Sequence, residues 1–299
     1  MNLPLVSILM TSYNRELFIA EAIESVLALN YTNFELIIVD DCSTDRTVSV
    51  AQKYVDVDER IRLYVNDQNL GDYNNRNRAA TFAKGKYLKY LDSDDIIFEW
   101  GLGVMVDCME KYPDAALGVS QHIGFNIIYP KWVAPIQIYR LYYYRNLLLV
   151  VGPTATIIRR DIFENSGGFS GEKYLGDTEL WLKISQKYPL VLIPPGQIYW
   201  REHEGQQISQ ERKELSVEAF RQQLNERILL DKDCPLPVKE SSAIIRNLLN
   251  IKCRRVFQCV LRGDVFYAIA RRKYLKFGIM DFLFALKKNK VPDQSFLNL

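Results

Sequence analysis

The chain has 299 residues, of which 48% are hydrophobic and 25% charged, as in an ordinary globular protein. This length allows a full buried core, in one large domain or in one domain with an extension. The net charge is only +2, but residues 252–290 carry eleven basic and two acidic side chains, so the basic excess lies near the C-terminus.

Five cysteines without a Cys-x-x-Cys pair argue against a zinc ribbon or a disulfide framework, and they fit a reducing compartment. The N-terminus lacks the basic segment and apolar run of a signal peptide. The longest apolar stretches, residues 147–151 and 277–286, are too short to span a bilayer. We therefore expect a cytoplasmic protein, with peripheral association on the inner face of the membrane as an open alternative.

The first hundred residues alternate between apolar strands and amphipathic helices. Strands are predicted at residues 5–10, 34–39, 60–65 and 86–91, and helices at residues 18–29, 45–54 and 72–83. Ser43, Thr44 and Asp45 can cap the second of these helices. This alternation predicts an α/β fold with a parallel sheet and right-handed crossovers.

Three carboxylates follow the strand of residues 86–91 within four positions: Asp92, Asp94 and Asp95. Side chains alternate along a strand, so Asp92 and Asp94 can share one face. Carboxylates this close repel one another, and a hard divalent cation with oxygen ligands relieves that repulsion. Open α/β sheets bind ligands at the carboxyl ends of their strands. The alternative is an acidic turn in which Asp95 caps the next helix.

The glycine-rich motifs that usually bind phosphate are missing. No Gly-x-Gly-x-x-Gly follows the first strand, and no Gly-x-x-x-x-Gly-Lys-Ser/Thr occurs in the chain. A metal ion that bridges phosphate oxygens would take their place.

The second half of the chain is less regular. A helix at residues 102–112 and a strand at 116–119 precede an aromatic-rich irregular segment, residues 121–145, whose tyrosines we assign to the core rather than to sugar stacking. Residues 152–160 predict a turn into a strand, and residues 205–209 a lid. Helices are predicted at residues 215–230, 241–262 and 264–288.

Several segments in register resemble the family 2 glycosyltransferases of the GT-A fold. They are residues 6–15, 38–45, 69–71 with 76–77, and 91–95. The resemblance covers residues 4–210 and implies a Rossmann-like, mostly parallel sheet flanked by helices. It divides the chain into a catalytic domain, residues 1–210, and a helical basic extension, residues 211–299; residues 1–100 form the nucleotide-binding half and 101–210 the acceptor half.

The resemblance also implies a role for each matching residue. Seven would bind a nucleotide-sugar donor: Thr11, Tyr13, Asn14, Asp41, Arg76, Asp92 and Asp94. Among them, Tyr13 would stack on the base and Asp41 would accept from a base N–H. Asp94, Asp95 and His203 would hold Mn²⁺ or Mg²⁺, and an imidazole ligand suits Mn²⁺ better.

Two departures from the family pattern are visible. Cys42 stands where the family usually has glycine, which matters if the backbone there needs a positive φ. In the segment of residues 174–181, Gly176 replaces the glutamate of the family's Glu-Asp motif, while Asp177 is retained. Asp177 would be the general base that deprotonates the acceptor hydroxyl. The alternative is an acid at a helix start, favoured by the helix dipole.

The resemblance predicts an inverting, metal-assisted glycosyltransferase of the hexosyl or N-acetylhexosaminyl type. The expected donor is a UDP-sugar, and the expected acceptor is a hydroxyl of a glycan or a lipid-linked sugar, in the synthesis of cell-surface polysaccharide or glycoconjugate. A nucleotidyltransferase and an inactive donor-binding scaffold are the alternatives. Residues 264–288 form a basic, Phe- and Leu-rich segment that can lie on an anionic membrane or pack against the catalytic domain or a second chain. No nucleic-acid-binding motif is present.

Overall fold

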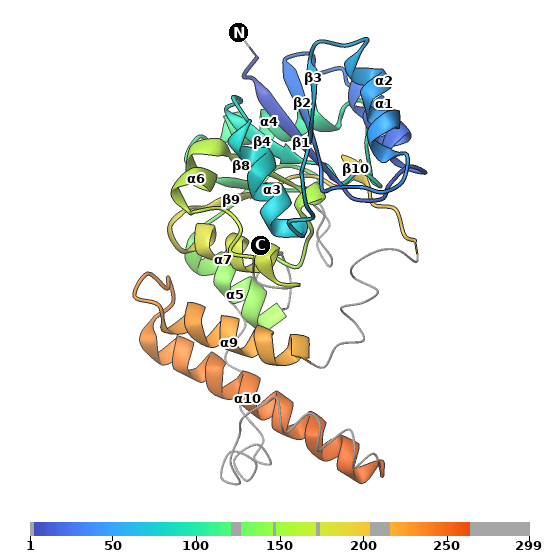
Figure 1. The fold of residues 1–299 in the computed structure, drawn as a ribbon. Coiled ribbons are helices and arrows are strands. Elements are labelled where there is room, and N and C mark those ends of the chain that lie inside the picture. The colour runs from blue at the N-terminus through green and yellow to red at the C-terminus, as the bar shows by residue number, and fades with distance from the viewer. Residues whose placement is uncertain (1–2, 121–126, 146–147, 172–173, 204–215, 264–299) are drawn as a thin grey trace.

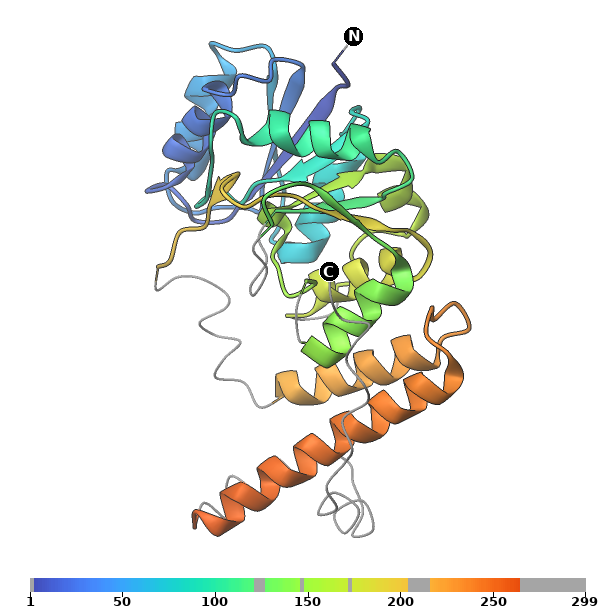
Figure 2. The same cartoon turned by 180° about the vertical axis from the view of Figure 1, so that it is seen from behind.

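The computed structural model describes residues 3–120, 127–145, 148–171, 174–203 and 216–263. Within these residues, a twisted sheet lies between two layers of helices, and a long helical hairpin lies beside one layer (Figures 1 and 2). The predicted α/β class, with a mostly parallel sheet and a helical C-terminal part, is therefore confirmed.

The main sheet has eight strands in the order β3-β2-β1-β4-β8-β6-β9-β7. In that order, they are Ile61–Val65, Phe34–Asp40, Val6–Ser12, Tyr87–Tyr90, Thr156–Arg159, Leu117–Val119, Leu190–Leu192 and Lys131–Val133. The first four strands are parallel, as predicted, whereas β8 and β7 run antiparallel to their neighbours. Two short strands, β5 (Ile96–Ile97) and β10 (Ile198–Tyr199), pair separately.

The helices divide between the two faces of the sheet. Apolar side chains of α1 (Ile19–Leu27), α2 (Thr47–Val55) and α4 (Gly101–Lys111) cover one face. The other face carries α3 (Asp72–Thr81), α5 (Pro135–Arg145), α6 (Arg160–Asn165) and α7 (Gly176–Lys187), with the short 3-10 helix η1 (Pro153–Ala155) before β8. Strands β1, β2 and β4 are thus buried on both sides, which explains their mostly apolar sequences, whereas the edge strand β3 is only partly buried.

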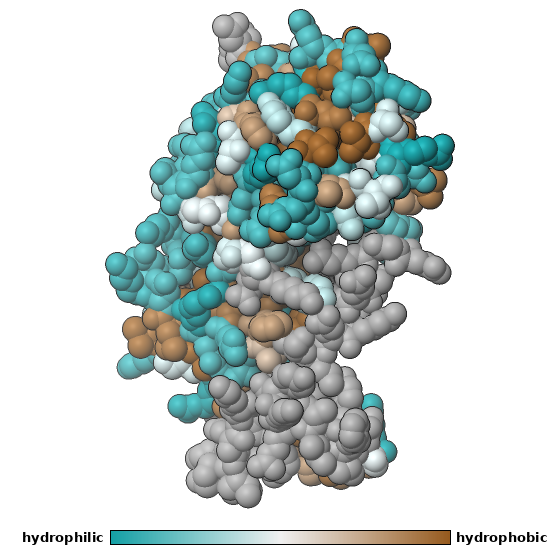
Figure 3. Space-filling view, viewed as in Figure 1, coloured by the Kyte–Doolittle hydropathy of each residue, from teal (hydrophilic) through white to brown (hydrophobic). Residues whose placement is uncertain are grey.

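The C-terminal hairpin consists of α9 (Ser216–Leu230) and α10 (Val238–Leu261). Leu224, Ile228 and Leu229 of α9 belong to the same apolar core as α5 and α7. Two ion pairs also connect the hairpin to the helices of the sheet: Arg227 of α9 pairs with Glu179 of α7, and Glu240 of α10 pairs with Arg140 of α5. None of the described helices is long and apolar enough to cross a bilayer. The face in Figure 3 is largely polar, with apolar side chains gathered over the region of β2 and β3.

The structure corrects the predicted irregular segment of residues 121–145. Its described part contains β7 and the helix α5, because residues 138, 139, 141 and 142 are buried at helical spacing. Tyr139 is fully buried and Tyr142 nearly so, which confirms that these tyrosines are core residues. The cap prediction at Asp45 was also wrong in register: α2 begins at Thr47, whose N–H donates to the Asp45 carboxylate over 2.9 Å. The predicted lid and the helix of residues 264–288 lie outside the described residues.

Candidate active site

The carboxyl ends of three adjacent parallel strands form one polar rim. β1 pairs with β2 on one side and with β4 on the other, in parallel register. The loops that follow these strands therefore meet at the same edge of the sheet, where open α/β sheets bind ligands. All of the donor residues predicted near the N-terminus lie on this edge or on α3 beside it.

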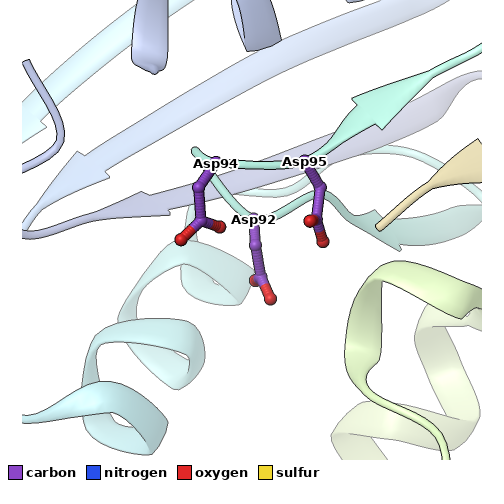
Figure 4. Close-up of side chains that lie close together, drawn as sticks. All are labelled: Asp92, Asp94 and Asp95. Carbon is purple, nitrogen blue, oxygen red and sulfur yellow. The ribbon is translucent and has the colours of Figure 1, made fainter. Parts of the chain in front are cut away.

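The loop after β4 holds the acid cluster. Asp92, Asp94 and Asp95 each offer a carboxylate oxygen, and these oxygens lie within 4.8 Å of one another. Figure 4 shows the three carboxyl groups directed to the same side of the loop. A short strand, β5, follows the loop and α4 begins only at Gly101, so the alternative of Asp95 as a helix cap is wrong.

Two of the three acids contact basic side chains that are distant from them in the sequence. Arg76 Nη1 lies 2.6 Å from Asp92 Oδ1. Asp94 Oδ2 accepts from Arg15 Nε over 3.0 Å and lies 2.9 Å from His203 Nε2. Arg15, in the loop after β1, and Arg76 of α3 therefore offset the charge of Asp94 and Asp92, in addition to the cation that the sequence predicts.

Asp95 differs from its neighbours. It is 1% exposed; its Oδ1 accepts from the Arg201 backbone N–H over 3.1 Å. Its Oδ2 is buried and lacks a hydrogen-bond partner among the described residues. Burial, and then the charge of Asp92, raise the pKa of Asp95 to about 7, while the hydrogen bond from the Arg201 backbone N–H acts in the opposite direction.

These observations fit a divalent cation. A buried carboxylate oxygen without a partner is costly, and a bound cation would offset that cost. His203 Nε2 and Asp94 Oδ2 already lie side by side, and an imidazole stacked on Phe18 at 4.7 Å between ring centroids is held in place. The oxygens of the cluster and the nitrogen of His203 form the mixed donor set that Mn²⁺ accepts.

The loops after β1 and β2 bind each other. The Asn14 N–H donates to Ser43 Oγ over 2.8 Å, and Asn14 Oδ1 accepts from the Thr44 N–H over 2.9 Å. Asn14 therefore holds the two loops together, with its own φ at 53°. Tyr13 is 46% exposed, whereas Thr11 is half-buried in β1.

Asp41 is buried in the turn that follows β2. Its carboxylate accepts from Asn66 Nδ2, from the Leu70 N–H and from the Gly71 N–H, at 2.7, 2.8 and 2.9 Å. Its contact with a nucleotide base stays a prediction. Arg76 is likewise committed within the protein, since it is nearly buried and bonds both Asp92 and Asp72.

Lys89 lies beneath the acid cluster, and the sequence analysis did not identify it. It is fully buried in β4, and its Nζ donates to the backbone oxygens of Tyr90 and Thr154. Burial lowers the pKa of Lys89 to about 7, although Asp92 and Asp95 act in the opposite direction. A lysine inside an apolar strand pattern was the available signal, because such a residue is almost never buried without partners.

Asp177 lies in the first turn of α7, half-buried. Its Oδ1 accepts from the Thr178 N–H over 2.6 Å, and the cap position itself is Leu175, which makes no side-chain cap. The neighbouring Glu179 is not a second base, because Arg227 and Ser170 bind its carboxylate.

The comparison with known proteins gives a family match over the part of the chain that contains the acid cluster. The family model described as "Glycosyl transferase family 2" matches residues 7–167, more than half of the chain. The putative teichuronic acid biosynthesis glycosyltransferase TuaG of Bacillus subtilis is 45% identical over 92 residues, 31% of this chain and 36% of that protein. The Escherichia coli UDP-Glc:alpha-D-GlcNAc-diphosphoundecaprenol beta-1,3-glucosyltransferase WfgD is 38% identical over 135 residues, 45% of this chain and 53% of that protein. The alignments thus span between a third and about half of these relatives.

Solved structures share the fold over nearly the whole chain. S. aureus TarS 1–349 in complex with UDP-GlcNAc has a TM-score of 0.66 at 20% identity, covering 94% of this chain and 79% of that one. The Pyrobaculum calidifontis mannosyltransferase PcManGT in complex with GDP-Man and Mn²⁺ has a TM-score of 0.61 at 16% identity, covering 95% and 86%. At these identities the likeness is one of fold.

Proposed function

From the premise that the chain belongs to glycosyltransferase family 2, we propose that it catalyses metal-assisted, inverting sugar transfer from a UDP-sugar to an acceptor hydroxyl. The acceptor in this proposal is a glycan or a lipid-linked sugar, in the synthesis of cell-surface polysaccharide or glycoconjugate. The name of WfgD, with its UDP-glucose donor and diphosphoundecaprenol-linked acceptor, supports both choices.

The acid cluster after β4 is the observation that carries the proposal. Its three carboxylates lie on the edge where the nucleotide half of the fold ends, and Asp95 Oδ2 is buried without a hydrogen-bond partner among the described residues. Asp94, Asp95 and His203 would hold Mn²⁺ or Mg²⁺. When bound, such a cation offsets the negative charge on a departing diphosphate.

The donor is bound by side chains of the rim. Tyr13, exposed at the end of β1, stacks on the base. Asn14 keeps the β1 and β2 loops together, and Thr11 and Asp41 line the same edge. Arg76 fixes the orientation of Asp92 through a 2.6 Å ion pair, so that the other oxygen of Asp92 is directed to the ribose or the sugar.

Asp177 acts on the acceptor. Its carboxylate takes the proton from the acceptor hydroxyl, and the freed oxygen attacks the anomeric carbon from the face opposite to the diphosphate. Attack from the opposite face inverts the configuration. The Thr178 N–H donates to Asp177 Oδ1 at the start of α7 and fixes the orientation of this carboxylate, so its second oxygen can accept the proton.

A panel of nucleotide sugars tests the donor half of this proposal. Purified protein is screened with each compound, with and without Mn²⁺, by thermal shift and by release of nucleoside diphosphate. A ligand at 100 times its Kd adds about 2.7 kcal/mol of stability, enough for a clear shift. We expect a UDP-sugar to give the largest shift and only with the metal. A shift unaffected by chelation would contradict the metal role.

The Asp177→Asn variant tests the acceptor half. Donor Kd should stay near that of the wild type, while turnover falls about 10²–10⁴-fold because a general base is lost. The matched control is Asp161→Asn, an exposed acid in the first turn of α6, which should turn over normally. If Asp177→Asn turns over within about threefold of the wild type, Asp177 is only a helix-start acid.

Association with an anionic membrane through residues 264–288 belongs to the same proposal. A basic surface of this kind would keep the enzyme near a lipid-linked acceptor. Sedimentation with anionic vesicles should decrease when residues 264–299 are deleted, and it should decrease with salt for the intact chain.

A further inference from the structure

Gly176 is a glycine because an aromatic ring fills the adjacent space. A Cβ built on Gly176 would lie 2.8–2.9 Å from three ring carbons of Tyr73. Separations of this size are shorter than van der Waals contact, and the ring belongs to α3, a helix anchored by other contacts. Any side chain at position 176 would therefore displace either Tyr73 or the start of α7.

The ring of Tyr73 is held in place from its other side. It stacks on Phe169 at 5.3 Å between centroids, and Phe169 in turn meets Trp181 of α7 edge-on at 6.0 Å. Asn77, one turn further along α3, brackets Phe169: its Nδ2 donates to the Phe169 carbonyl, and its Oδ1 accepts from the Phe169 N–H, at 2.7 and 2.9 Å. These contacts restrain the Tyr73 ring beside Gly176.

The hydroxyl of Tyr73 reaches the beginning of α7. Burial raises the pKa of Tyr73 well above its ordinary value, the carboxylates of Asp177 and Asp72 raise it further, and the nearby backbone of Asp177 acts in the opposite direction. The phenol is therefore neutral at physiological pH, next to the residue that carries the acceptor-side carboxylate.

We propose that Tyr73 and Gly176 form a matched pair that positions Asp177, with the Tyr73 ring setting the path of the α7 backbone. This inference rests on the proposed function, in which Asp177 is the base. Tyr73 is a positioning residue, since it acts through Asp177 and not on the acceptor. In this proposal, Gly176 replaces the glutamate of the family's Glu-Asp motif because the Tyr73 ring takes up the adjacent space. The replacement therefore does not indicate an inactive scaffold.

The pair also connects the two halves of the site. Asp72 precedes Tyr73 and bonds Arg76, which holds Asp92 of the acid cluster. A single helix, α3, therefore sets both the donor-side acid and, through Tyr73, the acceptor-side base. Attack of the acceptor hydroxyl on the donor sugar requires that the donor-side acid and the acceptor-side base are correctly placed relative to each other. A misplacement of about 1 Å can lower the rate about 10²-fold.

A double-mutant cycle tests the pair. The variants are Gly176→Ala, which adds a Cβ, Tyr73→Ala, which removes the ring, their combination, and Tyr73→Phe, which removes only the hydroxyl. Turnover is measured as UDP release from UDP-glucose and UDP-N-acetylglucosamine with Mn²⁺, where water is the smallest acceptor. Donor Kd and Tm are measured on each variant. Controls are Gly103→Ala in α4, where a Cβ meets only Tyr31 at 4.0 Å, and Tyr129→Ala, an exposed ring.

We expect Gly176→Ala to lower kcat about 10–100-fold in the wild-type background and less than about threefold in the Tyr73→Ala background. Tyr73→Phe keeps the ring and removes only the hydroxyl, so it should lower kcat less than Tyr73→Ala does. Donor Kd should stay within about twofold throughout, a pattern that a general loss of structure would not give. Both controls should match the wild type.

Equal costs of Gly176→Ala in the two backgrounds would overturn the pair, and so would kcat within about threefold of the wild type for both Tyr73 variants. The Asp177→Asn variant in the same assay separates this result from failure of the proposed function. If Asp177→Asn keeps its turnover, the base assignment fails. If Asp177→Asn loses turnover while the cycle is additive in both kcat and Tm, only the pair fails.

Discussion

Acidic residues end two strands that lie on either side of β1, namely β2 and β4, and their surroundings differ. After β2, Asp40 accepts from Ser12 Oγ and from the Ser43 N–H and hydroxyl, while Asp41 accepts from Asn66, Leu70 and Gly71. These donors are neutral, and three of the six are backbone N–H groups. After β4, the partners of Asp92 and Asp94 are long, charged side chains, and Asp95 keeps one oxygen without a partner among the described residues.

The difference separates acids that build the fold from acids that are available to a ligand. Backbone N–H groups cannot leave, so a carboxylate that binds them is part of the loop it organises. A guanidinium or an imidazole on a flexible side chain can exchange its carboxylate for a phosphate or make room for a cation. We therefore expect strand-end acids that look alike in the sequence to differ in their roles, and substitution can distinguish them.

The largest effect is expected for Asp94→Asn. It removes a carboxylate from the cluster and weakens the contacts of both Arg15 and His203. Donor binding that depends on Mn²⁺ should be lost, and turnover should fall about 10³-fold, since a cation on the diphosphate contributes several kcal/mol. Calorimetric titration of UDP-sugar with and without Mn²⁺ measures the change.

Stability should not rise in Asp94→Asn, although the sequence alone suggests relief of repulsion. The substitution removes one negative charge but leaves two basic groups without their full partner. Unchanged affinity for UDP-sugar with Mn²⁺ would contradict the metal role of Asp94.

The next effect is on stability, in Asp41→Asn. An amide has one acceptor oxygen, so its NH₂ group must face at least one of the N–H donors that now bind the carboxylate. We expect a loss of about 1–3 kcal/mol in the free energy of unfolding, measured with urea, and unchanged Mn²⁺ affinity. If the free energy of unfolding is unchanged and only the affinity for UDP weakens, Asp41 primarily contacts the nucleotide base, as the family resemblance implies.

The sequence predicts the parallel half of the fold because it is periodic there. Strands such as residues 34–39 are continuous apolar runs that end in polar residues, and the observed strand Phe34–Asp40 differs by one residue. The segment of residues 121–145 was misread because tyrosine fits a core helix and an irregular aromatic segment equally well. Only the packing of Tyr139 and Tyr142 against the sheet decides.

The acids of the candidate site could be predicted from the local sequence, whereas the basic side chains Arg76 and His203 were expected there only from the family resemblance. Asp92, Asp94 and Asp95 are adjacent in sequence, so their proximity is local. Arg15 and Arg201 meet them across 79 and 107 residues, and such contacts depend on the assembled sheet. Tyr73 next to Gly176 is a contact of the same kind, and no local pattern points to it.

A smaller, pH-dependent effect is expected for Asp95→Asn without metal. The fold raises the pKa of Asp95 from 3.8 to about 7, so the folded state binds this proton more tightly than the unfolded chain does. The protonated carboxyl therefore stabilises the folded state. This contribution is complete below pH 4 and is lost as the pH rises through 7. Asparagine stays neutral, so its Tm should exceed that of the wild type by a few degrees at pH 8 and by little at pH 4. Differential scanning calorimetry at both values checks this, and an equal difference at the two would contradict it.

The smallest effect concerns Cys42, directly after Asp41. Its φ is 66°, in the left-handed region, so the position does require the conformation that glycine adopts readily. A non-glycine residue there costs about 1–2 kcal/mol, and glycine gives back about 0.4–1 kcal/mol through the entropy of the unfolded chain. Cys42→Gly should therefore raise the free energy of unfolding by about 0.5–1 kcal/mol.

Cys42→Ala is the matched control, because it removes the sulfur and keeps the strain, and it should stay near the wild type. The Cys42 Sγ lies 3.9 Å from the Asp67 carbonyl, which is a weak contact at most. A loss of stability shared by both variants would mean that this contact outweighs the strain and that the turn after β2 depends on the sulfur.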